Sequence, residues 1–472
     1  MTREMGNGRY GRDVRQLRRA HCEVSGGHQA GRGGRPSADD SARASWPTFR
    51  AVRIWAVTLW VLAATGVGGL EVVRPDYPDD PTVWPNRTSS ANSDPWLVEH
   101  HRSLRRMEPR ILVINFANGC TAARAEVTAR ELAAALAEST RYHGYAKPEA
   151  PAFIRPRILR VVDLTDPAPF PDTPDGNSTK FPRVANWREG MINFAYRELY
   201  SERFAGYLGL AAADQPDRPL LLHELVARGL VHEVWFLAHH GKAGAPFECT
   251  ELKPVYDEQF RRVGDQHRHA GNGGDPDEPW HGRSLRITFI NWQRGIGCAL
   301  ENFGHALEGT ANSGVIPYFS RYFREFSGLD LDQRYGVPFG SFYAVNYGQS
   351  ALVYSEPDTL TVTHGDRQFK LAPYVAVGGN VHFPPNGRRH YDLDNPQTVR
   401  STIEHYRLAD GPDGHDLAAP WRIESFARYR RTMPDCMGPW LTYWRQNMPG
   451  LDNPCRDDAG QPMLNWWPFL YY

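Results

Sequence analysis

Five residues with side chains or conformations suited to chemistry share one face of a predicted helix. Arg294, Gly297, Glu301, His305 and Glu308 recur at close to helical spacing, and at about 100° per residue they form one narrow stripe. A cation, two carboxylates and an imidazole on one face could transfer protons, bind a metal ion or hold an anionic group. A solvent-exposed helix face carries the same kinds of residue for no functional reason. The stripe therefore predicts where chemistry could occur, but not which reaction.

The elements around this stripe predict an α/β fold. Apolar runs at residues 111–116, 158–164, 231–238 and 285–290 have the composition of strands buried on both faces, and helical patterns alternate with them. We expect these runs to be neighbours in a mostly parallel sheet with helices on both faces, followed by an irregular, aromatic-rich C-terminal region. The stripe then begins at a strand–helix junction, where open α/β sheets usually bind ligands.

Polar residues follow the predicted strands and would share one edge of the sheet. His239 and His240 come directly after the third strand, and Asn291 comes after the fourth. With His240 and His305 as ligands, and Glu301 as a third ligand or as a general base, this edge would suit a divalent metal such as zinc. The chain has no His-Glu-x-x-His motif and no dinucleotide or P-loop fingerprint.

Several motifs resemble those of a family of exported bacterial proteins of uncharacterised function. They are Glu233-Val-Trp235, Phe247-x-Cys249, Asn291-x-x-Arg294-Gly-x-Gly297, Glu301-x-Phe-Gly-His305-x-x-Glu308, Val381-His-Phe-Pro-Pro-Asn386 and Tyr391-Asp392, within roughly residues 110–445. Gln293 stands where the family carries Glu, and His239-His240 stands where relatives are Gly-rich. The resemblance implies that Glu301, His305, Arg294 and His382 belong to one site, and it implies no particular reaction.

Taken together, these observations assign roles to a small set of residues. We expect Glu301 and His305 to form the reactive centre, and metal ligation to involve His305, Glu301 and His240. The residues expected to bind substrate are Arg294, His382, Asn291 and Asn386.

The first 70 residues differ in composition from the rest. Residues 1–53 contain eleven Arg, no Lys and five acidic residues among many Gly and Ser, which predicts a disordered leader. Residues 54–70 carry no charge and directly follow Arg53, a pattern that fits either a transmembrane signal anchor or a cleaved signal peptide.

This pattern predicts export. Because positive charge stays on the cytoplasmic side, residues after this apolar run would lie outside the cytoplasm, in a single-pass membrane protein or a secreted one. Residues 71–109 are rich in Pro, Asp and Ser and are expected to be a linker, and residues 110–472 a single α/β domain with a C-terminal extension. If residues 54–70 are not cleaved, the membrane is a partner.

Two further expectations concern the cysteines and a histidine-containing segment. Export favours disulfide bonds, and Cys436 with Cys455 is the best candidate pair because the two bracket a compact segment. One further pair could form among Cys120, Cys249 and Cys298. Residues 264–283 contain three His among Gly, Asp and Pro and are expected to be a mobile insertion.

The composition limits the possible partners. Of 472 residues, 54 are Lys or Arg and 54 are Asp or Glu, so no overall positive field favours nucleic acid. We expect an extracytoplasmic hydrolase, metal-assisted or metal-free, acting on a polar substrate. The alternative is a non-catalytic cell-surface or secreted glycan-binding protein that would use the tryptophans after residue 418, which otherwise would fill a core. They are Trp421, Trp440, Trp444, Trp466 and Trp467.

Overall fold

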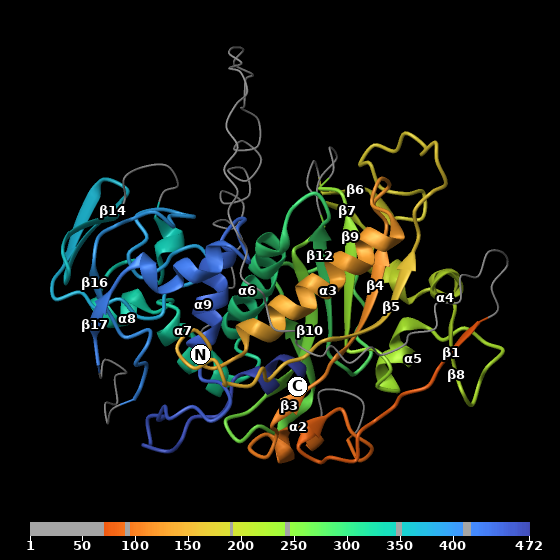
Figure 1. Ribbon diagram of the computed structural model, residues 1–472, viewed down its shortest axis with the longest axis horizontal. Helices are drawn as coiled ribbons and strands as arrows, with labels where there is room; N and C mark the ends of the chain where they lie inside the picture. The colour runs from red at the N-terminus through yellow and green to blue at the C-terminus, as the bar shows by residue number, and fades with distance from the viewer. Residues whose placement is uncertain (1–69, 90–94, 189–191, 241–245, 346–351, 409–416) are drawn as a thin grey trace, which may run out of the picture. The chain divides into compact units, whose positions relative to one another are not determined.

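Four parallel strands form the larger part of the main sheet. The computed structural model describes residues 70–89, 95–188, 192–240, 246–345, 352–408 and 417–472. The parallel strands are β4 (Arg110–Asn115), β5 (Arg157–Asp163), β9 (Glu233–Ala238) and β12 (Leu285–Asn291). They pair in the order β12-β9-β4-β5, each parallel to its neighbour, with β5 at the edge of the sheet (Figure 1). The prediction that the four apolar runs are adjacent and mainly parallel is confirmed.

Two antiparallel strands extend this sheet beyond β12. β10 (Cys249–Tyr256) pairs with β12, and β11 (Arg262–His269) pairs with β10 at the edge. Part of the segment expected to be a mobile insertion, residues 264–283, is therefore an ordered strand. β11 is polar and mostly exposed, so its sequence lacks the alternation or the apolar run by which a strand is predicted.

The two faces of the sheet belong to separate hydrophobic cores. Side chains alternate along a strand: Ile111 and Val113 lie in one buried cluster, and Leu112 and Ile114 lie in the other. The first cluster includes side chains of α3 (Ala122–Ser139) and α6 (Ile296–Ser313). The second includes side chains of η1 (Tyr196–Tyr200), α4 (Glu202–Leu208) and α5 (Leu222–Ala227). Burial on both faces explains why β4 and β9 carry continuous apolar runs.

Residues 71–109, expected to be a linker, are part of the compact unit that spans residues 70–472. β1 (Glu71–Val73) pairs in parallel with β8 (Leu210–Ala212), and β2 (Val83–Trp84) pairs in parallel with β3 (Arg106–Met107). Trp84, Leu97 of α2 (Pro95–His100) and Met107 are buried in the first core cluster. Single large apolar residues, spaced irregularly among prolines, pack into the core and hold this segment in place. Because their spacing follows neither the helix period nor the strand period, the sequence resembles a linker.

The C-terminal half contains short elements beside the main sheet. β13 (Leu352–Glu356), β14 (Thr359–His364) and β15 (Arg367–Leu371) form an antiparallel sheet. The helical elements are α7 (Pro317–Phe326), α8 (Leu331–Tyr335), η2 (Phe342–Ala344), η3 (Ile423–Arg430), α9 (Gly438–Gln446) and η4 (Trp467–Tyr471).

Two further strand pairs lie outside these sheets. One, in the first half of the chain, is β6 (Arg183–Arg188) with β7 (Ile192–Phe194), and the other, in the C-terminal half, is β16 (Val399–Ser401) with β17 (Ala419–Trp421).

The tryptophans of the C-terminal region fill the core. Trp440, Trp444 and Trp466 are completely buried, and Trp421 and Trp467 are nearly so. They belong to the same cluster as the residues that contact α3 and α6. The aromatic-rich C-terminal region is thus present, and its tryptophans are not a stacking surface for sugars.

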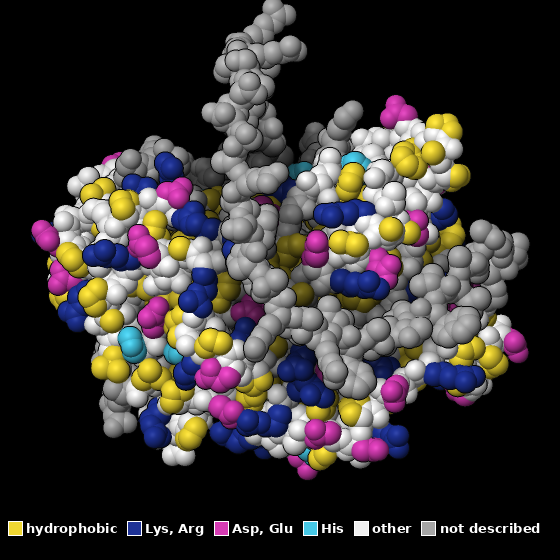
Figure 2. Space-filling model, viewed as in Figure 1, with side chains coloured by type: hydrophobic (Ala, Val, Ile, Leu, Met, Phe, Trp, Pro, Cys, Tyr) yellow, Lys and Arg dark blue, Asp and Glu magenta, His cyan; other side chains and the backbone are white. Residues whose placement is uncertain are grey.

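The predicted leader (1–53) and nearly all of the predicted membrane segment (54–70) lie outside the described residues. Within the described part of the chain, no helix is both long enough and apolar enough to cross a membrane. On the face drawn in Figure 2, Lys and Arg side chains are interspersed with Asp and Glu side chains. The mixed charge of this face agrees with the equal numbers of basic and acidic residues in the sequence.

One disulfide bond joins Cys298 to Cys436, with 5.3 Å between the two Cα atoms and 138 residues between them in sequence. The predicted Cys436–Cys455 pair is wrong: Cys455 is a buried residue outside this bond, as are Cys120 and Cys249. The sequence suggested a short local loop. Packing of the first turn of α6 against the residues before α9 instead brings Cys436 to a distant partner.

Candidate functional site

Helix α6 is held at its start by a loop from far along the chain. The carboxylate of Asp435 accepts hydrogen bonds from the backbone N–H of Gly297, at 2.9 Å, and of Cys298, at 3.1 Å. Helix N-termini leave such N–H groups unpaired, so a carboxylate there stabilises the helix. A Cβ atom at residue 297 would collide with the backbone oxygen of Asp435. Gly297 is therefore required for this close contact rather than for any chemistry of its own.

The stripe of polar residues on α6 faces the protein interior. Glu301, His305 and Glu308 are only 6%, 8% and 6% exposed. The interpretation of this stripe as an ordinary solvent-exposed helix face is therefore wrong. Gly304 lies between the two acidic turns, and a Cβ atom there would come within 2.7 Å of the side chain of Val381. The glycine lets the segment that carries His382 pack directly against α6.

Three side chains bring donor atoms to one point. Nε2 of His382 lies 3.0 Å from Nε2 of His305 and 3.0 Å from Oε1 of Glu301. Nε2 of His305 lies 3.9 Å from the same carboxylate oxygen. The two imidazole rings are nearly perpendicular, with an angle of 87° between their planes. The structure thus joins the two predicted catalytic residues with a third residue that is 77 positions from His305.

The far nitrogen of each imidazole has its own partner. Nδ1 of His305 lies 2.9 Å from Oε2 of Glu308, and Nδ1 of His382 lies 3.0 Å from Nδ1 of His390. Glu308 also accepts hydrogen bonds from the hydroxyl of Tyr343 and from the backbone N–H of Val381. These contacts restrict the rotation of both rings and direct each Nε2 atom toward Glu301.

The segment around His382 is itself held in a specific conformation. The side-chain oxygen of Asn380 accepts hydrogen bonds from the backbone N–H groups of His382 and Phe383. Tyr391 has a φ of 60°, an uncommon value for a residue other than glycine. Its backbone N–H donates to the carbonyl of His382, and its hydroxyl donates to Oε1 of Glu301 at 2.7 Å. A backbone conformation that costs free energy thus directs a phenol onto the central carboxylate.

The cluster combines ionised carboxylates with imidazoles of unequal basicity. Burial alone would raise the pKa of Glu301, but the imidazoles of His305 and His382 hold that pKa well below its usual range. Burial would lower the pKa of His305, but the carboxylates of Glu248 and Glu308 raise it well above its ordinary value. The pKa of His382 is lowered, chiefly by burial. Two neighbouring groups with pKa values displaced in opposite directions are typical of sites that transfer protons or bind ions.

Other residues predicted for the site lie elsewhere. Arg294 is exposed beside the disulfide, with its guanidinium 3.4 Å from the Sγ atom of Cys298. The side chain of Asn291 caps its own turn by accepting a hydrogen bond from the N–H of Gln293. Asn386 is buried and donates to the carbonyls of Asn395 and Gln397. The structure therefore gives Asn291 and Asn386 local structural roles.

His240, predicted as a metal ligand, is exposed at the end of β9 and is not part of the cluster of three donors. Its neighbour His239 is held by loops after other strands: its N–H donates to Asn177, and its ring contacts the carbonyl of Asn118. Proximity to the end of a strand placed His240 at the correct edge of the sheet. The position of His240 in the sequence does not show which way the chain turns after β9. That turn decides whether the His240 side chain can reach α6.

Sequence reasoning missed three partners of the cluster as individual residues. His390 and Tyr391 follow His382 within nine residues; Tyr391 belongs to one of the motifs of the resemblance, but neither residue was given a role. Tyr343 lies in an aromatic-rich stretch and carries no local signal that separates it from neighbouring tyrosines.

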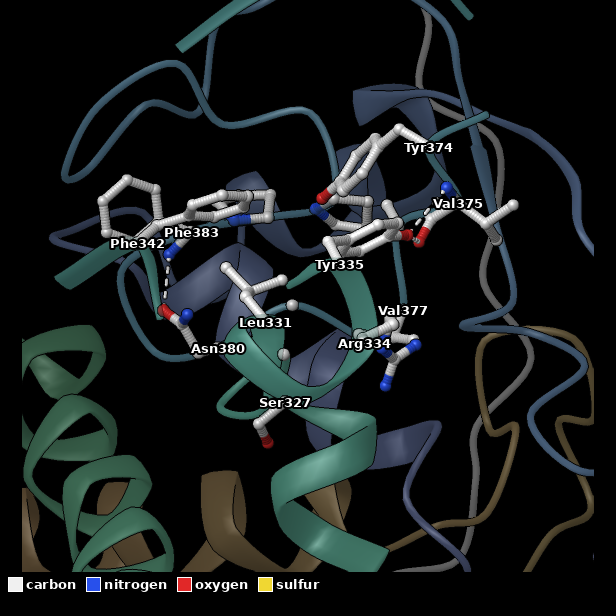
Figure 3. Close-up of a pocket in the computed structure, with 15 residues that line it drawn as sticks. Ser327, Leu331, Arg334, Tyr335, Phe342, Tyr374, Val375, Val377, Asn380 and Phe383 are labelled. Carbon is white, nitrogen blue, oxygen red and sulfur yellow. Dashed lines mark hydrogen bonds between the residues drawn. The ribbon is translucent and has the colours of Figure 1, made fainter. Parts of the chain in front are cut away.

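A small hollow lies on another side of the same segment (Figure 3). Tyr335, Phe342, Tyr374, Asn380 and Phe383 are among the residues that line it, and none of the three donor residues does. Figure 3 shows the hydrogen bond between the side chain of Asn380 and the N–H of Phe383. Most of the residues that line the hollow are aromatic, apolar or glycine, with Arg334 and Asn380 among its polar ones.

Comparisons with protein-family models, with curated protein sequences and with solved structures gave no match. The resemblance to a family of exported bacterial proteins therefore stays a prediction, and any proposal for function depends on the geometry of the cluster.

Proposed function

We propose that this protein is an extracytoplasmic hydrolase whose reactive centre consists of Glu301, His305 and His382. The observation that carries the proposal is the convergence of one carboxylate and two imidazoles within 3.0–3.9 Å in a site that is almost completely buried. Hydrolysis needs a group that takes a proton from water and a group that gives a proton to the leaving atom. An ionised carboxylate beside two imidazoles provides both.

The roles of the individual groups differ. Glu301 is the candidate general base because its neighbours keep it ionised. His305 is the candidate proton donor because its pKa is raised and Glu308 orients it. His382 lies between the two and contacts both. Tyr343 and Tyr391 position the carboxylates through their hydroxyl groups.

The disulfide bond supports the exported half of this proposal. Disulfides such as Cys298–Cys436 persist mainly in oxidising compartments. Together with the arginine-rich residues 1–53 and the uncharged run at 54–70, this favours a domain outside the cytoplasm, either secreted or attached to the membrane by a single span.

We also propose that the sheet is a layered α/β structure with helices on both faces. Support comes from the two core clusters, one including α3 and α6 and the other including α4 and α5.

The glycan-binding alternative has no support from the C-terminal tryptophans on which it relied. All five that the sequence singled out are 3% exposed or less. A side chain that is buried in the core cannot stack on a sugar ring.

The test is a hydrolysis assay on the full chain against chromogenic esters, amides, phosphoesters and glycosides. We expect turnover of at least one class, and a loss of at least about 100-fold in kcat/KM for Glu301→Gln, which removes the charge and keeps the shape. The matched control is Glu258→Gln, because Glu258 is exposed between β10 and β11. Thermal unfolding of both variants checks that the fold is kept. Equal activity in Glu301→Gln and wild type, or no turnover of any class, would contradict the proposal.

A further inference from the structure

We propose that Oε1 of Glu301, Nε2 of His305 and Nε2 of His382 bind one divalent cation of the zinc type and leave one coordination position open. This deepens the proposed hydrolase, with which it shares these residues, by naming its cofactor. With a cation bound, Glu301 and His305 would act as its ligands rather than as free base and acid, and a water on the open position would supply the nucleophile. The ligand set differs from the one that the sequence predicted, because His382 takes the place of His240.

The distances among the three atoms suit coordination. Their separations are 3.0, 3.0 and 3.9 Å. Three atoms with these separations lie on a circle of about 2.0 Å radius, so one point is about 2.0 Å from all of them, which is the usual bond length from zinc to nitrogen or to carboxylate oxygen. An ion slightly outside their plane would keep similar distances and face an open position. The 3.9 Å separation between Glu301 and His305 corresponds to an angle of about 160° at that point, so a small side-chain movement would bring the three ligands to the tetrahedral arrangement usual for zinc.

Hydrogen bonding alone does not explain the same contacts. A ring nitrogen carries either one proton or one lone pair in the plane of the ring. Nε2 of His382 nevertheless has two polar neighbours at 3.0 Å, one on Glu301 and one on His305. Only one of these contacts can be a well-directed hydrogen bond. A cation among the three atoms satisfies all of them at once and replaces the shared proton.

The surroundings of the three atoms match those of metal ligands. Histidine ligands usually donate their other N–H group to a carboxylate, a carbonyl or another acceptor, which fixes the ring and its tautomer. Here His305 has Glu308 in that place, and His382 has His390. The ligand oxygen of Glu301 is hydrogen-bonded by Tyr391. All three candidate ligands therefore have an orienting partner.

Charge also favours a cation. The hydrogen-bond and ion-pair partners of Glu301 and Glu308 in the described part of the chain are imidazole, phenol and peptide N–H groups rather than Lys or Arg. Buried carboxylates need compensation by a paired charge or a metal ion. A divalent ion supplies it at the point where the donors converge.

The donor set identifies the class of ion. Two imidazoles and one carboxylate with an open position occur in catalytic zinc sites, where the ion lowers the pKa of a bound water. The same set also binds Fe(II) in oxygenases. The side chains of the three residues are 6–10% exposed. Hydrolysis needs no redox change, and we therefore assign the zinc type.

A second group of possible metal ligands does not compete. Cys298, Asp435 and Cys436 also lie within reach of one another. The two sulfur atoms are bonded to each other, however, and the Asp435 carboxylate caps α6. Metal binding to cysteine requires thiolates, so this group has a structural role while the disulfide is intact.

The test is zinc binding by the full chain, measured without reference to any substrate. The protein is stripped with a chelator and titrated with Zn²⁺ by calorimetry, and the bound metal is counted by elemental analysis. We expect one Zn²⁺ per chain, and affinity at least about 100-fold weaker in His305→Ala and His382→Ala. The matched control is His267→Ala on the exposed strand β11, which should bind as tightly as wild type.

A second measurement avoids dependence on the folding of the variants. Adding Zn²⁺ to the stripped wild-type chain should raise its Tm, because the ion binds only the folded state. Absence of stoichiometric zinc, or zinc lost in His267→Ala and kept in His382→Ala, would overturn the metal site. Tighter binding of Fe²⁺ than of Zn²⁺ would overturn the zinc assignment.

The two proposals can fail separately. Stoichiometric zinc without hydrolysis of any substrate class supports the metal site and contradicts the hydrolase. Hydrolysis that depends on Glu301 and persists in fully stripped protein, with no zinc rebound, supports the hydrolase and contradicts the metal site.

Discussion

Two of the buried polar clusters in the described part of the chain are built on opposite principles. One consists of Glu233, Glu251, Lys253 and Arg286 on the strands of the main sheet, and the other is the cluster of Glu301, His305 and His382. Both are almost completely buried. They differ in how their charges are compensated, and this difference separates a structural network from a candidate site.

In the sheet network, each charge has an opposite partner. Arg286 binds Oε2 of Glu251 at 2.9 Å and Oε1 of Glu233 at 3.1 Å, and Lys253 binds Oε1 of Glu251 at 3.0 Å. Lys253 and Arg286 also donate to the backbone carbonyl of Leu470. Although burial alone would raise the pKa of Glu251, Arg286 and Lys253 lower it. Two cations balance two carboxylates, and no group is directed at an external ligand.

The site cluster has carboxylates and imidazoles but no Lys or Arg among the partners of its acids in the described chain. Its donor atoms converge on a point instead of pairing off. Burial of polar groups is thus not by itself a sign of function. The informative feature is a set of acidic and imidazole groups that lack a Lys or Arg partner and face the same small volume.

The largest effect on stability is expected from the sheet network. Arg286→Met would leave Glu233 and Glu251 buried without their shared cation, and we expect a loss of about 3–5 kcal/mol in the free energy of unfolding. Urea unfolding measures it. The matched control is Arg261→Met, because Arg261 pairs with Asp257 on the surface, and its loss should be below about 1 kcal/mol. If Arg286→Met lowered the free energy of unfolding by no more than Arg261→Met does, the network would not stabilise the fold as proposed.

A smaller effect is expected at the site, and on a different property. Glu308→Gln keeps the shape of the side chain but removes the charge that orients His305, so zinc affinity should fall by about 10–100-fold. Zinc titration measures the affinity, and urea unfolding of the metal-free protein should show less destabilisation than Arg286→Met does. Tyr343→Phe, which removes one hydrogen bond to Glu308, should weaken zinc binding less. Unchanged zinc affinity in Glu308→Gln would show that Glu308 does not orient His305 for metal binding.

A third effect, seen only as a pH dependence, concerns a buried acid that resembles neither cluster. Burial, with Asp275 and Glu251 nearby, raises the pKa of Glu278 from 4.5 to about 8, although Thr250 donates a hydrogen bond to it. The folded protein therefore keeps a proton that the unfolded chain releases between these values. Stability should fall as pH rises from about 4.5 to about 8, by at most about 1.4 kcal/mol per pH unit.

Glu278→Gln should remove this part of the pH dependence, because the amide does not titrate. Urea unfolding at pH 5 and pH 8 compares the two proteins, with Glu258→Gln as an exposed control. An identical slope in wild type and Glu278→Gln would show that Glu278 is ionised in the folded state.

Local patterns were sufficient for the centre of the fold and insufficient at its margins. The four parallel strands could be predicted because each carries several large apolar residues, and in β4 and β9, which are buried on both faces, these form a continuous run. β11 could not be predicted because an exposed edge strand needs no apolar residues. The segment 71–109 resembles a linker in sequence because isolated anchors such as Trp84 have no period.

The sequence by itself determined that Glu301 and His305 share a helix face, since a spacing of four residues fixes their relative position in any α-helix. The resemblance placed His382 in the same site, and the structure confirms that the three side chains meet. Only the tertiary structure decided that this face is buried, that His382 rather than His240 completes the three donors, and that Cys436 pairs with Cys298. These partners are 77 to 138 residues apart. Contacts over such distances depend on how whole segments pack, as where Gly304 admits Val381, and periodicity carries no information about that packing.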